Sequence, residues 1–182
     1  MQGSLRGARI RAVTDGRRLV LVRHAKAEPF AATDHDRELT ESGRREAEAA
    51  GAYLRDRSVL PDHAVVSPAE RTRATWEAME QVMASGAEVV YDAACYAGST
   101  DVVLESLRYV PKQARVVVFV GHQPAIGYLA HLLDDGDGDH DALHSMLHGF
   151  PTASMALFDV GVAWEELGPE AGRLLDFRAG KG

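Results

Sequence analysis

The sequence places an uninterrupted run of apolar, β-forming residues, Leu19–Val22, directly before an Arg–His pair. Such a run suits a central strand of a parallel sheet that is covered on both faces. Open α/β sheets bind ligands at the carboxyl ends of such strands, where Arg23 and His24 are expected. Arginine offers phosphate a planar fork of donors, and histidine offers a nucleophile or proton carrier near neutral pH. Taken alone, however, the pair is equally compatible with a polar turn after a strand.

Strand-like and helix-like patterns alternate along the rest of the chain. Further strands are predicted at 64–67, 88–91, 115–120, 154–160 and 173–177, and helices at 40–57, 68–86, 101–110 and 124–133. Thr40 is the expected N-cap of the first helix, and Pro68 is expected to open the second. The alternation predicts an α/β fold, with a mainly parallel sheet flanked by helices on both faces. A length of 182 residues suits one domain, which we place at 18–182 after an N-terminal extension, 1–17, that we expect to be flexible.

Composition and charge argue against several classes of function. The formal net charge is −7 and no basic stripe is visible, so we expect no nucleic-acid partner. No apolar run is long enough to span a membrane, and the Gly- and Arg-rich start lacks the apolar core of a secretory signal. The single cysteine, Cys95, rules out an internal disulfide and is consistent with a reducing compartment. We therefore expect a cytoplasmic protein without a membrane partner.

Two later segments repeat the pattern of a polar side chain after a strand. Arg71 falls in the first turn of the helix that follows the second predicted strand, and His122 comes soon after the fourth. If these strands and the first are neighbours in one parallel sheet, Arg23, His24, Arg71 and His122 converge at one edge. Two guanidinium groups and two imidazoles would repel one another without an anion among them, and a phosphoryl group is the natural occupant. Considered singly, Arg71 could be a surface residue and His122 a capping or turn residue.

Metal binding is not favoured by the acidic and histidine-rich segments. The segment Asp134–Asp141 has aspartates at alternate positions, as a calcium loop has. However, His140 stands where that loop needs glycine, and Met146 where it needs glutamate. His140, His144 and His148 would share one face of a helix, but no carboxylate accompanies them as in a His-Glu-x-x-His zinc site. We interpret Asp134–Asp141 as a solvated surface loop and expect no metal.

Together these segments resemble the histidine phosphatase superfamily, which has the phosphoglycerate-mutase-like fold. In the first matching segment, Arg23-His24-Ala25, alanine stands in place of the family's glycine. The others are Leu39-Thr40-x-x-Gly43, the segment Ser67-Pro68 followed by Arg71, Thr72 and Thr75, and Gly121-His122. Their order and spacing agree with the family from Leu19 to Gly127. The short length, and the sequences Cys95-Tyr96-Ala97 and His122-Gln123-Pro124, are most similar to bacterial SixA-type phosphohistidine phosphatases.

The resemblance implies a covalent mechanism in which His24 is the nucleophile and becomes a phosphohistidine. Arg23 and Arg71 would hold the phosphoryl oxygens, and His122 would donate a further hydrogen bond to them, most usefully in its charged form. Water would then release phosphate. The attacking nitrogen of His24 must be unprotonated, so its other nitrogen is expected to donate to a backbone carbonyl. The resemblance implies no metal and no organic cofactor.

The stretch Ala93–Ser99 departs from part of the family in a way that bears on the substrate. Mutase and sugar-phosphatase relatives carry a glutamate general acid in this region, and here the stretch contains no carboxylate. An alkoxide leaving group benefits from such an acid. Imidazole, whose conjugate acid has a pKa of about 6.5, needs it far less. The sequence therefore favours removal of phosphate from phosphohistidine on a protein.

Two other functions stay open. Glu28, Asp34 or Asp36, in the loop after the first strand, could supply an acid, and the protein would then be a small-molecule phosphomonoesterase. A non-catalytic phosphate-binding module is the alternative from a different class. The presence of two histidines and two arginines of the family pattern argues against that last reading.

Overall fold

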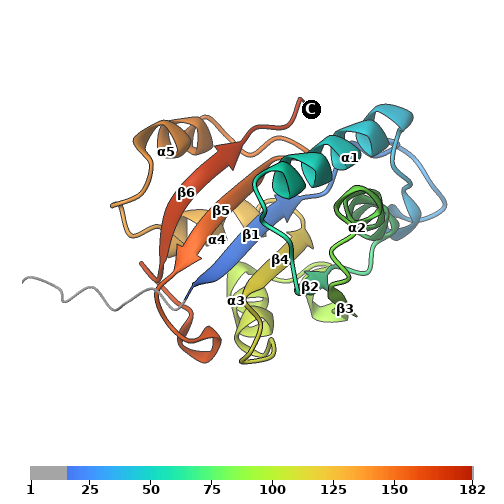
Figure 1. Cartoon of the computed structure of the whole chain (residues 1–182). Helices are drawn as coiled ribbons and strands as arrows, with labels where there is room; N and C mark the ends of the chain where they lie inside the picture. The colour runs from blue at the N-terminus through green and yellow to red at the C-terminus, as the bar shows by residue number, and fades with distance from the viewer. Residues whose placement is uncertain (1–15, 182) are drawn as a thin grey trace, which may run out of the picture.

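The computed structural model describes residues 16–181, which form one six-stranded sheet with helices on both faces (Figure 1). The strands are β1 Arg17–Arg23, β2 His63–Val66, β3 Glu88–Tyr91, β4 Val116–Gly121, β5 Met155–Val160 and β6 Gly172–Arg178. The helices are α1 Glu41–Asp56, α2 Glu70–Met83, α3 Thr100–Arg108, α4 Ala125–Leu133 and α5 His140–Leu147. Three short 3-10 helices connect them: η1 Asp34–Asp36, η2 Ala93–Cys95 and η3 Trp164–Glu166. The α/β fold predicted from the sequence is confirmed.

The order of strands in the sheet is β3-β2-β4-β1-β5-β6. The first four run parallel to one another, whereas β5 pairs antiparallel with β1 and β6 antiparallel with β5. The expectation of a mainly parallel sheet is therefore confirmed, with two antiparallel strands on one side. Strands β2, β4 and β1 are direct neighbours, so their carboxyl ends lie at the same edge of the sheet.

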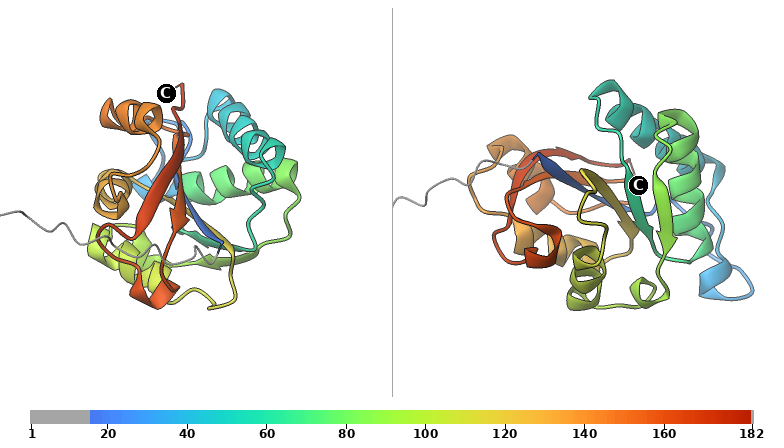
Figure 2. Two further views of the ribbon diagram at one scale, coloured as in Figure 1. Left: turned by 60° about the vertical axis from the view of Figure 1, so that its left-hand side comes forward. Right: turned by 60° about the horizontal axis from the view of Figure 1, so that its bottom comes forward.

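Side chains alternate along β1 between two apolar layers. Helices α1 and α2 cover one face of the sheet, and α3, α4 and α5 cover the other (Figure 2). Leu19 and Leu21 belong to the apolar layer with α3, α4 and α5, whereas Val20 and Val22 belong to the layer with α1 and α2. All four side chains are fully buried, which is the burial expected for a central strand. The two layers hold β1 from both sides and fix the direction in which its carboxyl end points.

The start of α1 agrees with the sequence prediction, and the start of α2 does not. Thr40 caps α1, because its Oγ accepts a hydrogen bond from the Gly43 N–H at 2.9 Å. Pro68 is expected to open α2, but that helix begins at Glu70. Ser67, the residue before Pro68, donates its N–H to the Val120 main-chain oxygen of β4 at 3.0 Å. The chain is therefore tied to the sheet edge at this point, and the helix starts only after it.

The described residues begin just before β1. The extension predicted to be flexible, 1–17, lies outside the described residues except for Gly16 and Arg17, and Arg17 is already part of β1. The folded part described here therefore starts slightly before residue 18. Within 16–181, no helix combines the length and the apolar character needed to cross a membrane.

Candidate active site

The sheet edge at the carboxyl ends of β1 and β4 brings the predicted site residues together. Arg23, the last residue of β1, pairs in register with Gly121, the last residue of β4. The His24 N–H donates to the Gly121 main-chain oxygen at 3.0 Å, and His122 follows directly. The ring centroids of His24 and His122 lie 5.3 Å apart. Arg71, in the first turn of α2, is close enough for its charge to lower the pKa of both rings. We call these four side chains, Arg23, His24, Arg71 and His122, the cluster.

His24 is held with one ring nitrogen fixed and the other available. Its Nδ1 lies 2.8 Å from the Ala25 main-chain oxygen, a contact that the Nδ1–H tautomer satisfies by donating, which leaves Nε2 unprotonated. The Ala25 N–H donates in turn to Thr75 Oγ at 2.9 Å. Burial lowers the pKa of His24 to about 4, and the charges of Arg71 and Arg23 add to this effect. The backbone partner expected from the sequence is present, and the ring is neutral near pH 7.

Three nitrogen atoms of the cluster are buried and have no hydrogen-bond partner. They are Nε of Arg23, Nε of Arg71 and Nδ1 of His122. Buried polar atoms in proteins are nearly always hydrogen-bonded, so three unpartnered nitrogens in one cluster indicate a site for an acceptor-rich anion. A phosphoryl group offers several charged acceptor oxygens and matches this set of donors.

The connection from α5 to β5 holds Arg23 in place. The Arg23 Nη1 donates to the Phe150 main-chain oxygen at 2.9 Å. The Arg23 N–H donates to the Ser154 main-chain oxygen at 3.0 Å, and the Ala153 N–H is shared between the main-chain oxygens of Arg23 and His24. The orientation of Arg23 therefore depends on a segment that carries none of the predicted site residues.

His122 is paired with a serine that sequence reasoning did not assign to it. Its Nε2 lies 2.8 Å from Ser67 Oγ. Burial, followed by the neighbouring His24 and Arg71, lowers the pKa of His122 to about 3. The ring is thus neutral near pH 7, in contrast to the charged form expected to be most useful. From the sequence, Ser67 stands out only as the first residue of a family motif, because its partner becomes apparent only once β2 and β4 are neighbours.

Asp34, in η1, is the acidic residue that the structure brings to the cluster. Arg71 donates through Nη1 to the Asp34 main-chain oxygen at 2.6 Å and through Nη2 to its carboxylate at 3.0 Å. Arg37 and Tyr96 donate to the same carboxylate at 3.0 and 2.8 Å. The bonds from Arg37 and Tyr96, together with the nearby Arg71, hold the pKa of Asp34 well below its usual range. Asp34 is therefore ionised and acts as an acceptor.

The other two candidate acids, Glu28 and Asp36, have partners within their own loop. The Asp36 carboxylate accepts a hydrogen bond from Thr33 Oγ at 2.7 Å. Glu28 is held through its main chain, whose oxygen accepts a bond from Arg37 Nε at 2.7 Å. Of the three candidate acids, Asp34 is therefore the one whose carboxylate contacts Arg71. The spacing of the three residues in the sequence gives no reason to prefer one of them.

The stretch without a carboxylate, 93–99, places Tyr96 beside the cluster. This stretch forms η2 and the residues after it. The Tyr96 ring lies edge-on to the His122 ring, with 5.9 Å between centroids, and 5.1 Å from the His35 ring. A phenol that donates to Asp34 therefore occupies this part of the site rim. From the sequence, Tyr96 stands out only as part of a family similarity.

The acidic segment 134–141 is a surface loop that continues into α5. The carboxylates of Asp135 and Asp137 lie 3.8 and 3.9 Å from the Arg173 guanidinium. Asp139 caps α5 by accepting a hydrogen bond at 2.8 Å from a main-chain N–H of its first turn. In the part of the chain that the structure describes, no group of three or more His, Cys, Asp or Glu side chains is arranged to hold a metal ion. Asp135, Asp137 and Asp139 thus have structural partners.

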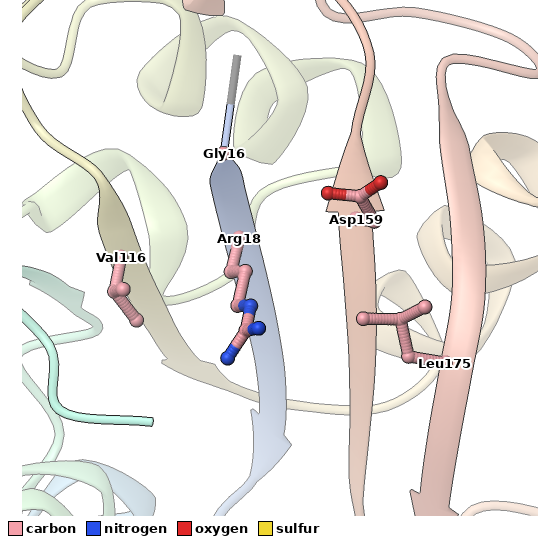
Figure 3. Close-up of a pocket in the computed structure, with 5 residues that line it drawn as sticks. All are labelled: Gly16, Arg18, Val116, Asp159 and Leu175. Carbon is pink, nitrogen blue, oxygen red and sulfur yellow. The ribbon is translucent and has the colours of Figure 1, made fainter. Parts of the chain in front are cut away.

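A pocket of about 440 Å³ lies at the other end of the sheet (Figure 3). It is lined by Gly16, Arg18, Val116, Asp159 and Leu175. Val116 on β4 and Asp159 on β5 are both register partners of Arg18, near the start of β1. This pocket is therefore separated from the cluster by most of the length of β1, and its lining residues are all different from those of the cluster.

A family model and solved structures both match this chain to histidine phosphatases. Residues 19–94, which include Arg23, His24 and Arg71, match the histidine phosphatase superfamily (branch 1). The solved structure of a SixA protein from Nakamurella multipartitia is 34% identical, with a TM-score of 0.80, over 91% of this chain and 97% of that one. The chain belongs to the histidine phosphatase superfamily.

Within this superfamily the protein is of the SixA type, and it is a phosphatase. The SixA structure from Agrobacterium tumefaciens is 32% identical, with a TM-score of 0.74, over 90% of this chain and 97% of that one. An uncharacterized protein from Mycobacterium leprae is 30% identical over 163 residues, which are 86% of this chain and 98% of that protein. The two solved structures confirm the phosphoglycerate-mutase-like fold expected for a histidine phosphatase.

Proposed function

We propose that this histidine phosphatase removes phosphate from phosphohistidine on another protein, and that it does so through a covalent phosphohistidine on His24. The observation that carries the proposal is the position of a neutral His24, with Nε2 free, among three unpartnered nitrogens of Arg23, Arg71 and His122. A nucleophile within an anion-binding site supports turnover of a phosphorylated substrate rather than binding alone. The similarity to SixA proteins supports the same substrate class.

In the first step, Nε2 of His24 attacks phosphorus and a P–N bond to His24 forms while the P–N bond to the substrate imidazole breaks. The electrons of the broken bond stay on the leaving nitrogen, and a proton taken from solvent by the other ring nitrogen lets a neutral imidazole depart. In the second step, water attacks phosphorus, the electron pair of the P–N bond returns to Nε2, and the proton of the water passes to solvent. Phosphate leaves, and His24 is restored.

The three neighbouring side chains stabilise the charge that the phosphoryl oxygens carry during both steps. Arg23 and Arg71 supply fixed positive charge and N–H donors, and His122 supplies one further ring nitrogen. Donors held in place in a buried site are worth more than donors in water, because they need no reorganisation when the charge develops. Removal of one such donor typically lowers kcat about 10²- to 10³-fold.

The state of Asp34 supports nitrogen as the leaving atom. The carboxylate that reaches the cluster is ionised, with its pKa held low by Arg37 and Tyr96, so it has no proton to give. General-acid assistance is typically worth about 10²- to 10⁴-fold, and an alkyl phosphate forgoes it at such a site. Imidazole leaves readily without it, because its conjugate acid has a pKa of only about 6.5.

The substrate claim is tested by comparing kcat/KM for three substrates: a protein phosphorylated on histidine, a sugar phosphate and an aryl phosphate. We expect the phosphohistidine protein to be turned over best and the sugar phosphate worst. A clear preference for the sugar phosphate would refute phosphohistidine as the substrate.

The covalent step is tested by trapping labelled phosphoenzyme at alkaline pH, where P–N bonds persist. His24→Gln should abolish both the label and turnover. His144→Gln, which replaces an exposed histidine of α5, should retain both. Full activity of His24→Gln would overturn the assignment of the nucleophile.

A second candidate function, hydrolysis of small phosphomonoesters, is favoured by the contact between Asp34 and Arg71. Asp34 could act as the acid if a bound phosphate displaced it from Arg71 and raised its pKa. In that case Asp34→Asn would abolish turnover of alkyl phosphates. The main proposal instead predicts that Asp34→Asn retains turnover of phosphohistidine, so this one variant separates the two functions.

A further inference from the structure

Ser67, at the end of β2, is a buried hydroxyl that faces the ring of His122. Ser67 is 0% exposed, and its Oγ lies 2.8 Å from His122 Nε2. The main chain of Ser67 is held independently of this contact. Its N–H donates to the Val120 main-chain oxygen at 3.0 Å, and its carbonyl accepts a bond from Thr72 Oγ at 2.7 Å. The hydroxyl is therefore fixed in position relative to the ring.

His122 has a single ring proton to place on one of two nitrogens. The ring is surrounded by the cations Arg71 and Arg23 and by His24, and it is neutral near pH 7. A neutral imidazole has one N–H and one lone pair. Nε2 faces Ser67, and Nδ1 is buried without a partner. The direction of the Ser67 hydrogen bond therefore decides what Nδ1 offers to the cluster.

The two tautomers have opposite effects on a bound phosphoryl group. If Nε2 carries the proton, it donates to Ser67 Oγ, and Nδ1 turns a lone pair toward acceptor oxygens, which repel it. If Nδ1 carries the proton, the Ser67 hydroxyl donates to Nε2, and Nδ1–H is free to donate to the phosphoryl group. Only the second arrangement satisfies both ring nitrogens when an anion is bound.

We infer that Ser67 is a positioning residue, whose hydroxyl donates to Nε2 of His122 and so fixes the tautomer that presents Nδ1–H to the phosphoryl group. The inference rests on the phosphate site of the proposed function and deepens it. It assigns to the first residue of the Ser67-Pro68 segment a task in the reaction, carried out entirely through His122. It also explains how a neutral histidine serves as a phosphate donor in this site.

The direct test is a long-range ¹H–¹⁵N NMR spectrum of the full chain, recorded at pH 7 with saturating inorganic phosphate. The signals of His122 are assigned by their loss in His122→Gln. We expect Nδ1 of His122 to be protonated and Nε2 to be unprotonated in the phosphate complex. An Nε2–H tautomer or a doubly protonated ring in that complex overturns the inference, whatever the variants do.

Variants separate the positioning role from a structural one. Ser67→Ala should lose the preference for the Nδ1–H tautomer and lower kcat/KM roughly tenfold, in keeping with the loss of one hydrogen bond in a buried site. Thr72→Val removes the hydroxyl that donates to the Ser67 carbonyl and leaves the His122 contact in place. It should keep the wild-type tautomer. If Ser67→Ala keeps it too, Ser67 has no positioning role.

The same spectra distinguish failure of this inference from failure of the proposed function. Phosphate should shift the signals of both His24 and His122 in the wild-type protein. If phosphate shifts neither, the phosphate site is absent, and the proposed function and the inference fall together. If phosphate shifts both while His122 carries its proton on Nε2, the site stands and only the role of Ser67 is refuted.

Discussion

Arg71 donates to Asp34 through both terminal nitrogens of its guanidinium group, at 2.6 Å to the main-chain oxygen and 3.0 Å to the carboxylate. Its Nε is the atom left unpartnered. A carboxylate thus occupies part of the donor set that the proposed reaction assigns to the phosphoryl group. Because both groups are anions that use the same arginine, a bound phosphate competes with Asp34 for Arg71.

Removal of the Asp34 charge should therefore strengthen phosphate binding. We expect Asp34→Asn to lower the inhibition constant of inorganic phosphate several-fold, because the amide binds Arg71 more weakly than the carboxylate does. Asp36→Asn is the matched control, since Asp36 lies in the same short helix and its carboxylate is bonded to Thr33. A constant that is unchanged or higher in Asp34→Asn would show that the two anions do not compete.

The pKa of His24 should lie far below the value of an exposed histidine. Burial is the main cause of the shift to about 4, and it acts by disfavouring the charged ring. The measurement is an NMR titration of the imidazole C–H signals between pH 3 and pH 8, with His24 assigned through His24→Gln. A midpoint near the unperturbed value of about 6.5 would contradict the burial argument and the neutral nucleophile.

Stability should fall as the pH drops below about 6.5. The pKa of His24 is lower in the folded state than in the unfolded chain, so the unfolded state takes up its proton first. The stability contributed by neutral His24 is fully present above pH 6.5 and is lost as the pH falls toward 4. Between pH 7 and pH 5 this group alone removes about 2 kcal/mol from the free energy of unfolding.

Urea denaturation at the two pH values measures this loss, and His24→Gln should show a smaller difference between them. The buried ring of His122, whose pKa is also lowered, should preserve part of the pH dependence in that variant. An equal pH dependence in wild type and variant would show that His24 is not titrating in this range.

Thr75 links the backbone beside His24 to the backbone of Arg71, and its replacement should lower the stability of the fold. Its Oγ accepts a bond from the Ala25 N–H at 2.9 Å and donates to the Arg71 main-chain oxygen at 2.6 Å. Thr75→Val leaves the buried Ala25 N–H without a partner, so we expect a loss of about 1–3 kcal/mol in the free energy of unfolding. Thr75→Ser keeps the hydroxyl and should retain most of the stability. Chemical denaturation of the two variants checks this, and equal losses would point to packing instead of hydrogen bonding.

The central strands, and the site residues that follow them, are the part of this protein that the sequence predicts. The apolar runs before Arg23 and His122 predict two central strands, and the residue types that follow them indicate phosphate chemistry from the sequence alone. The sheet order then confirmed that β1, β2 and β4 are neighbours. Such patterns are local, so one sequence is enough to reveal them.

The contacts between loops could not be predicted in the same way. Ser67 meets His122 only because two strands far apart in the chain are adjacent, and Asp34 meets Tyr96 across 62 positions. Glu28, Asp34 and Asp36 share one loop, and only its folded path decides which carboxylate reaches Arg71. The lowered pKa of His122 could not be predicted from the sequence for a related reason, because burial is a property of the folded site and not of its residue types.

The hold of the segment 150–154 on Arg23 has a consequence for the design of new phosphatases. The four side chains of the cluster come from β1, α2 and the end of β4, but backbone groups of Phe150, Ala153 and Ser154 contact the Arg23 guanidinium and the main chain around it. Grafting the four side chains onto another parallel sheet would therefore transfer the reacting groups without the backbone contacts that orient Arg23. The smallest transplantable unit includes the antiparallel strand β5 and the turn that leads into it.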